Sequence, residues 1–158
     1  MDSINYQPIG IIHTSFKERQ GTPRQAIGAT KQNAIIEVFQ NFVEGLDDLC
    51  EYSHLIVVFH MHLIEGVQMK VFPSWAKKPR GVFSSVAPHR PNPIGVSVVK
   101  IDDLKGNEIS ISGVDMVDGT PVLDIKPYIP VLFPKENIDI GWYEGHIETM
   151  LSSCTGDK

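Results

Sequence analysis

The apolar and β-branched residues of this chain come in short runs, and turn residues close each run. Runs such as Leu55-Ile56-Val57-Val58-Phe59 are too short to cross a bilayer and have the length of strands. We expect strands at residues 9–16, 34–39, 54–63, 67–72, 81–84, 95–104, 108–114 and 122–125. Many short strands at this spacing predict a mainly β fold, a small closed or nearly closed β-barrel with a few short helices.

Local patterns refine this expectation. The run from 54 begins almost entirely apolar, which predicts a strand buried on both faces. Lys105-Gly106-Asn107 predicts a hairpin turn, and Asp118-Gly119-Thr120-Pro121 predicts a second sharp turn. We expect short helices at residues 42–52, where apolar residues recur with helical spacing, and at 145–152.

The composition bounds the class of protein. A length of 158 residues suggests one domain over residues 1–158. A hydrophobic content of 42% and a charged content of 21% are ordinary for a globular protein. The start of the chain lacks a signal-peptide pattern, and its two cysteines make no disulfide framework, so we expect a cytoplasmic location.

The charge and the missing motifs exclude several functions. A net charge of −5 excludes a basic field over the whole molecule. Local binding of nucleic acid stays possible through two clusters, although solvated surface charge is the simpler explanation of each: Lys17, Arg19, Arg24 and Lys31, and Lys77, Lys78, Arg80 and Arg90. The sequence has no Rossmann glycine motif after a first strand, no P-loop and no GxSxG nucleophile elbow.

The stretch APHRPNPIG at 87–95 is unusually stiff. Its three prolines fix their own backbone and restrict the residues before them, which holds His89, Arg90 and Asn92 extended. A rigid loop loses little entropy when a ligand binds. Arg90 offers a forked donor for a carboxylate or phosphate, and Asn92 offers a donor and an acceptor. The alternative is a structural crossover in which Arg90 pairs with an acid of the protein itself.

Three further stretches carry polar groups suited to a site. In DMVDGTPVLDIKPY at 115–128, Asp118 either caps the turn or meets a ligand, and Lys126 either neutralises Asp124 or meets an anionic substrate. Arg24 and Gln25, in GTPRQ at 21–25, suit polar recognition or simply lie in an exposed loop.

The stretch His60-Met61-His62 allows a metal site. On a strand these two histidines share a face, and His89 is a conceivable third ligand. We favour two hydrogen-bonded histidines at the barrel rim over a metal pair.

Four blocks together resemble the TsaA-like family, also called the TrmO family: PRQ at 23–25, RGVF at 80–83, HRPNPIG at 89–95 and DGTPVLDIKPY at 118–128. Their order and spacing match the family from about residue 9 to about residue 130. The resemblance implies a small β-barrel that binds S-adenosyl-L-methionine and forms homodimers, with the cofactor near the subunit interface. It also implies N6 methylation of threonylcarbamoyladenosine, next to the anticodon of certain transfer RNAs.

The resemblance assigns roles to particular residues and requires no metal. Asp118 would act as a base, and Arg90 or Lys126 would pair with the threonyl carboxylate of the substrate. The cofactor contacts that it implies are Pro23, Arg24, Gln25, His62, Leu63, Asn92, Ser112, Gly113, Val114 and Asp115. The two basic clusters would hold the backbone of the anticodon loop.

The sequence departs from the family pattern in two places. Ser85-Val86-Ala87 stands where the family usually has Thr-Arg-Ser, so an arginine is missing at Val86. The chain also ends soon after the barrel, and we expect no extra C-terminal domain of the kind that bacterial members carry. Two alternatives stay open: an S-adenosyl-L-methionine-binding module with no transfer activity or with another acceptor, and a histidine-ligated metal enzyme.

Overall fold

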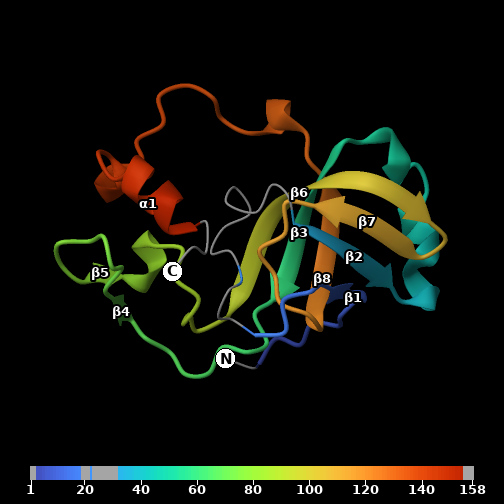
Figure 1. Ribbon diagram of the computed structural model, residues 1–158, viewed down its shortest axis with the longest axis horizontal. Helices are drawn as coiled ribbons and strands as arrows, with labels where there is room; N and C mark the ends of the chain where they lie inside the picture. The colour runs from blue at the N-terminus through green and yellow to red at the C-terminus, as the bar shows by residue number, and fades with distance from the viewer. Residues whose placement is uncertain (1–2, 19–21, 23–31, 155–158) are drawn as a thin grey trace.

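The computed structural model describes residues 3–18, 22 and 32–154 of the chain. Within them, six strands form a closed antiparallel barrel in the order β1-β2-β7-β6-β3-β8, and β8 pairs with β1 to close it. The predicted closed β-barrel with few short helices is confirmed (Figure 1). The strands are β1 Gly10–His13, β2 Asn33–Val38, β3 His54–His60, β6 Ile94–Lys105, β7 Glu108–Ser112 and β8 Thr120–Pro127.

Buried and less buried residues alternate along the barrel strands, as β3 shows. In β3, Leu55, Val57 and Phe59 are buried, while Ile56 and Val58 between them are only half-buried. The prediction that this strand is buried on both faces is therefore wrong, because in a closed barrel only one face points into the interior. The core consists of Ile12, Ala34, Ile36, Val38, Leu46, Leu49, Leu55, Val57, Phe59, Val99, Ile109, Ile111, Val114, Met116 and Val122.

A second unit lies outside the barrel, in the long connection between β3 and β6. We call residues 64–93 the distal module. It holds a two-stranded ribbon of β4 Lys70–Val71 and β5 Arg80–Gly81, followed by the 3₁₀ helix η4 Val82–Ser84. Figure 1 shows this module at the left, well away from the barrel strands.

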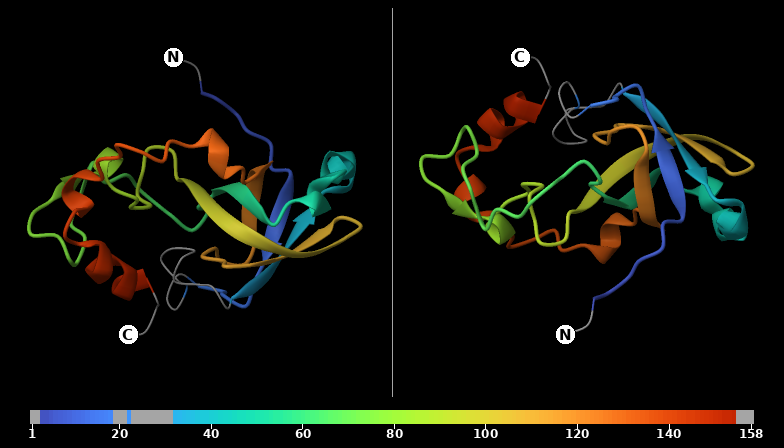
Figure 2. Two further views of the ribbon diagram at one scale, coloured as in Figure 1. Left: turned by 90° about the horizontal axis from the view of Figure 1, so that it is seen from above. Right: turned by 90° about the horizontal axis from the view of Figure 1, so that it is seen from below.

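The C-terminal segment, residues 128–154, runs from the barrel to the distal module. It contains the 3₁₀ helices η5 Pro130–Leu132 and η6 Gly141–Tyr143 and the helix α1 Ile147–Cys154. Both views in Figure 2 show α1 beside the module. Trp142 fixes this contact: its ring stacks on Trp75 with centroids 4.8 Å apart, and its Nε1 donates to the carbonyl of Ser84 at 2.7 Å.

Several predicted elements are shorter or different in kind. The helix expected at 42–52 is two 3₁₀ helices, η2 Gln40–Leu46 and η3 Leu49–Glu51, because Asp48 between them is left-handed (φ 62°). The strand expected at 54–63 ends at His60, where its ladder to β6 ends.

The distal strands and the last helix also differ from expectation. The strand expected at 67–72 is reduced to β4, and the one at 81–84 ends at Gly81 and becomes η4. Each of these strands has one partner, which supports only a short ladder. Helix α1 starts two residues later than predicted, after the left-handed Gly145.

The barrel gathers three connections at one end, which we call the site end. Strands β1, β3 and β7 finish there and β2, β6 and β8 begin there, as the pairs His13↔Ile35, Asn33↔Ser112 and His60↔Ile94 require. Connections 14–32, 61–93 and 113–119 therefore open from the same end. No helix among the described residues is long and apolar enough to cross a membrane.

Candidate active site

The site end brings most of the sequence-predicted residues together. Connection 61–93 carries His62, Leu63 and Asn92, while β7 and connection 113–119 carry the stretch from Ser112 to Asp118. Pro23, Arg24 and Gln25 lie outside the described residues, within connection 14–32. The described residues among them thus share one end of the barrel although they are far apart in the sequence.

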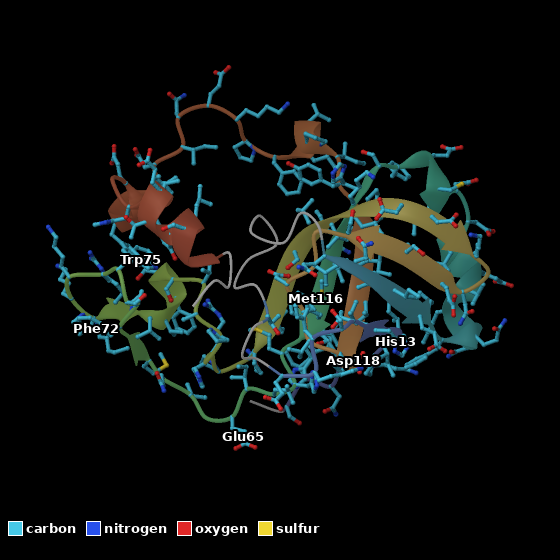
Figure 3. The ribbon with its side chains drawn as sticks, in the orientation of Figure 1. His13, Glu65, Phe72, Trp75, Met116 and Asp118 are labelled. Carbon is cyan, nitrogen blue, oxygen red and sulfur yellow. The ribbon has the colours of Figure 1, made fainter. Side chains whose placement is uncertain are left out.

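Asp118 links two of these connections. Its carboxylate accepts hydrogen bonds from the backbone N–H of Thr14 (3.0 Å) and from Nζ of Lys17 (2.7 Å), and its own N–H donates to Phe16 O (2.7 Å). Figure 3 shows Asp118 near His13, at the end of β1. The hydrogen bond from Lys17, followed by that from Thr14, lowers the pKa of Asp118. A carboxylate with a lowered pKa is a weak base, so this geometry favours a role in holding the start of connection 14–32.

His62 lies against the opening turn of β8. Its Nδ1 is 3.5 Å from the Thr120 hydroxyl, which also donates to Val117 O at 2.7 Å. A Cβ atom at Gly119, which has φ +75°, would lie 4.0 Å from Nε2 of the imidazole. Burial, and secondarily the nearby His60, lower the pKa of His62. A neutral imidazole therefore stands at the site end near neutral pH, where it can lie beside a cationic ligand without repulsion.

The segment after β7 presents its backbone to the site end. Gly113, at φ +82°, donates its N–H to Gln32 O at 3.0 Å, which joins connections 14–32 and 113–119 a second time. Val114 and Met116 are buried in the core, and Asp115 accepts a hydrogen bond from Ser97 Oγ at 2.7 Å. Only the backbone of Val114 is therefore available for a contact with a cofactor, because its side chain is buried.

Arg90 points into the distal module. Its Nη1 donates to the carbonyls of Val82 (3.0 Å), Ser85 (2.9 Å) and Ala87 (3.4 Å), and its guanidinium carbon lies 5.8 Å from the centroid of the Phe83 ring. The structural alternative expected an acid as its partner, but these contacts are to carbonyl oxygens. Arg90 holds η4 in place, and a direct role toward substrate stays a prediction.

Backbone hydrogen bonds hold the proline-rich loop, residues 87–95, at two points. Met61 N–H donates to Pro93 O at 2.8 Å, and Gln68 N–H donates to His89 O at 3.0 Å. Asn92 lies between these two contacts and is exposed. The loop therefore presents Asn92 to solvent at the site end with little freedom to move.

Lys126 is not brought to the site end. It follows Thr120 by six residues along β8, a separation of about 20 Å in a strand. There it is exposed and forms an ion pair with Asp124. This is the neutralising role that the sequence allowed, and the geometry does not place Lys126 in one cleft with Asp118.

A pocket lies away from the site end, beside the start of β1 and the end of β2. This pocket, of about 390 Å³, lies between η2 and β8, beside Phe42 and Asp124. None of the predicted site residues lines it. Within the described ranges, no three His, Cys, Asp or Glu side chains are placed to hold a metal ion. His62 lies beyond the end of β3, and Nδ1 of His89 contacts the carbonyl of Glu65 at 3.1 Å.

Sequence reasoning missed two threonines at the site end. Thr14 binds the Asp118 carboxylate through its N–H, and Thr120 contacts His62. A local signal existed for Thr14, because its hydroxyl accepts the Phe16 N–H at 3.0 Å in the turn that Ser and Thr favour after a strand. Thr120 lies inside the DGTP block, but its partner His62 is fixed only by barrel closure.

Comparison with known families finds a match over most of the chain. The family model of the tRNA-methyltransferase O N-terminal domain matches residues 11–132. The chain belongs to this family. The resemblance predicted from the four sequence blocks is therefore confirmed.

Related proteins share the family over most of this chain. A probable S-adenosyl-L-methionine-binding protein of Pyrococcus abyssi is 46% identical over 93% of this chain and 80% of its own length. A mouse tRNA (adenine(37)-N6)-methyltransferase is 38% identical over 85% of this chain but only 33% of its own length. The crystal structure of TrmO from Pseudomonas aeruginosa matches with a TM-score of 0.73 and 34% identity, over 89% of this chain and 63% of that one.

Proposed function

We propose that this protein uses S-adenosyl-L-methionine to methylate N6 of threonylcarbamoyladenosine, next to the anticodon of transfer RNA. The observation that carries the proposal is that the HRPNPIG block ends and the DGTPVLDIKPY block begins at one barrel end, beside the neutral imidazole of His62. Methyl transfer with this cofactor is what family membership and the names of the relatives support. The modified adenosine as acceptor rests on the resemblance of the blocks.

The side chains at the site end have the chemistry that the cofactor needs. S-adenosyl-L-methionine supplies an electrophilic methyl group and brings a sulfonium cation and an adenine ring. Neutral His62 tolerates the cation, Leu63 is 43% exposed and offers an apolar surface, and Asn92 offers an exposed amide for the adenine edge. The residues present therefore fit the cofactor.

The protein must align the acceptor nitrogen and remove its proton. Alignment on a rigid site supplies several kcal/mol of a barrier by proximity. The N6 nitrogen belongs to a urea-like group, whose proton is more acidic than that of a plain amine. Near neutral pH, the neutral imidazole of His62 is a better acceptor for this proton than the stabilised carboxylate of Asp118.

We further propose a homodimer that works in the cytoplasm, where transfer RNA is available. Support for a subunit contact comes from the C-terminal segment, where Val131 and Leu132 are 76% and 72% exposed. Clustered apolar exposure of this kind is typical of interaction surfaces. The mass of the protein in solution, measured by light scattering, tests the dimer.

The methylation test uses two forms of one transfer RNA. Protein is incubated with methyl-labelled cofactor and threonine transfer RNA that either carries or lacks the threonylcarbamoyl group. We expect label only in the modified RNA, at N6 of the adenosine next to the anticodon. Labelling of both forms, or of another nucleotide, would reject the proposed acceptor.

A second candidate is a cofactor-binding module with no transfer activity or with another acceptor. Val86, which is 64% exposed, stands where the family usually has an arginine, and the Pyrococcus relative is named only as a binding protein. Calorimetry with S-adenosyl-L-methionine on metal-free protein distinguishes the outcomes. Micromolar binding without methylation of modified RNA would favour this second candidate.

A further inference from the structure

The distal module carries an unusual charge pattern. Between Glu65 and Asp102 the sequence has no acidic residue, while residues 66–93 contain five cations, in a chain with a net charge of −5. These cations are Lys70, Lys77, Lys78, Arg80 and Arg90. Among the described residues, none of the five forms an ion pair with an acid. The module therefore keeps its positive charge available for a polyanion.

The two faces of the β4–β5 ribbon differ sharply. On the inner face, Val71 is buried, and the guanidinium of Arg80 lies 4.6 Å from the ring centroid of Trp142 in the C-terminal segment. Strand alternation places Lys70 on the other face, where it is exposed. Phe72, which follows β4 directly, is 63% exposed. Figure 3 shows Phe72 farther from α1 than Trp75, which packs on the C-terminal segment.

The outer face has open space at Gly81, and an exposed phenylalanine follows each strand of the ribbon. Lys70 pairs with Gly81, and a Cβ atom at Gly81 would meet only Ser84 Oγ, at 3.8 Å. Phe72 follows β4 at one end of this pair, and Phe83, which is 70% exposed, follows β5 at the other. The bare backbone of Gly81 and the two rings leave room for planar groups.

We propose that this outer face binds single-stranded RNA, with bases stacked on Phe72 and Phe83 and phosphates held by Lys70, Lys77 and Lys78. Exposed aromatic rings beside unpaired cations are the combination that holds single strands, because every base has a stacking face and every nucleotide a phosphate. The inference deepens the proposed function, since the RNA would be the transfer RNA substrate, whose anticodon loop is single-stranded. It assigns the contact to a module outside the barrel.

A second copy of the chain fits this face less well. In a two-fold dimer the same patch meets itself. A patch with unpaired cations and no acid would then face its own charge, which is destabilising. Charge therefore favours a nucleic acid over a subunit contact here, in contrast to the uncharged Val131 and Leu132.

The test measures RNA binding separately from methylation. The probe is a fluorescent, unstructured single-stranded RNA of about 12 nucleotides without modified bases. We expect Phe72→Ala and Phe83→Ala each to weaken binding by about five- to a hundredfold, since one stacked base is worth roughly 1–3 kcal/mol. Tyr6→Ala is the matched control, because Tyr6 is an aromatic residue that is 66% exposed outside the module, and it should bind like the wild type.

Two further variants separate stacking from charge and from folding. Gly81→Val fills the open space at Gly81 without removing a ring. The backbone of Gly81 (φ −63°, ψ 140°) accepts any side chain, so RNA binding should fall while the circular dichroism spectrum stays unchanged. Lys77→Ala with Lys78→Ala should reduce the slope of log affinity against log salt by about 0.7 per lost phosphate contact. Lys105→Ala, which removes an exposed lysine at the β6–β7 hairpin, should leave that slope unchanged.

The outcomes are distinct. Equal RNA affinity of all variants would overturn the inference. So would a change from dimer to monomer in the phenylalanine variants without loss of RNA affinity, because the face would then be a subunit interface. Weakened RNA binding in the module variants alone supports the inference, even where the protein methylates no transfer RNA and the proposed function fails.

Discussion

At the scale of single residues, the contacts of Asp118 redefine its role. Its carboxylate is shared between Thr14 N–H and Lys17 Nζ, and the side chain is only 28% exposed. These bonds stabilise the charged form and leave little basicity for catalysis. The same bonds hold the first residues of connection 14–32, which carries the PRQ block. These contacts favour a role for Asp118 in positioning connection 14–32, and its role as a base stays a prediction.

Replacing Asp118 with Asn should therefore have only a small effect on stability and on methylation. The amide oxygen still accepts the Thr14 N–H, and only the pair with Lys17, which is 70% exposed, is lost. Exposed ion pairs contribute up to about 1 kcal/mol, so we expect urea denaturation to show a loss no larger than that. Methylation should stay within about tenfold of wild type. A hundredfold loss of turnover with unchanged cofactor affinity would instead identify Asp118 as the base.

The lowered pKa of Asp118 should also make the stability of the fold depend on pH. Because its folded pKa is lowered, its stabilising contribution is present above the unfolded value of about 4 and is lost as pH falls through the folded pKa. The Asp118→Asn variant should lack this part of the acid sensitivity.

The lowered pKa of His62 predicts that cofactor binding depends on pH. Burial lowers its pKa below 6.5, so the imidazole is neutral above that pH in the folded and the unfolded chain. As pH falls below 6.5, the unfolded chain takes up the proton first, which reduces stability, and the folded protein takes it up at lower pH. Protonated His62 would repel the sulfonium, so affinity should be constant at and above about pH 6.5 and fall at lower pH, as the folded protein takes up this proton.

Calorimetric titration at several pH values measures this dependence, and His62→Gln is the control. The amide keeps a polar group at the position but does not titrate, so its affinity should stay flat on acidification. An identical pH profile in wild type and variant would remove His62 from the cofactor site.

At the scale of elements, the HRPNPIG block contains a packing requirement besides its stiff backbone. Gly95 pairs with Phe59 across β6 and β3, and a Cβ atom there would lie 2.2 Å from the Phe59 ring. The glycine therefore lets an aromatic core residue lie flat against the neighbouring strand. This explains the residue without any contact to a ligand.

Gly95→Ala should destabilise the barrel by about 1–3 kcal/mol, because the Phe59 ring must move in a close-packed core. Gly45→Ala is the matched control, since a Cβ atom there would meet nothing within 4 Å, and its stability should change little. Urea denaturation followed by circular dichroism measures both. Equal stability of the two variants would show that the ring has room to shift.

At the scale of the whole molecule, the C-terminal segment joins the barrel to the distal module. Residues 131–140 are all exposed, and contact resumes at Trp142 and Tyr143. The Tyr143 hydroxyl accepts the N–H of Val86 at 3.3 Å, beside the stacked pair of Trp75 and Trp142. A small set of aromatic contacts therefore fixes the module, which has only a two-stranded ribbon of its own.

Trp142→Ala should release the module while leaving the barrel folded. The variant loses the stacking on Trp75 and the bond to Ser84, which together hold the C-terminal segment against the distal module. We expect faster hydrogen exchange in residues 66–93 and 141–154 and unchanged exchange in β3 and β6. Ile138→Ala, at a side chain that is 58% exposed, is the control. Exchange that rises equally in the barrel would show that module and barrel fold as one unit.

Much of the barrel could be predicted from local pattern. Alternating apolar residues and the turns at Lys105-Gly106-Asn107 and Asp118-Gly119 located the barrel strands, because strand period and turn chemistry depend on neighbours in sequence. The weak elements were misjudged for the same reason: residues 67–72 and 81–84 have strand-like composition, but tertiary structure offers them only each other. The assignment of residues 1–158 to one domain stays a prediction.

The amino-acid sequence by itself determined the class of fold and the family, because both depend on periodicity and on short blocks of fixed order. Only the tertiary structure decided which of those residues meet. Thr14 and Asp118 are 104 positions apart and are joined by the pairing of β1 with β8, whereas Lys126, eight positions from Asp118, is carried to the far end of its strand. Closure of the barrel sets these distances, and closure depends on register between strands that no local stretch of sequence contains.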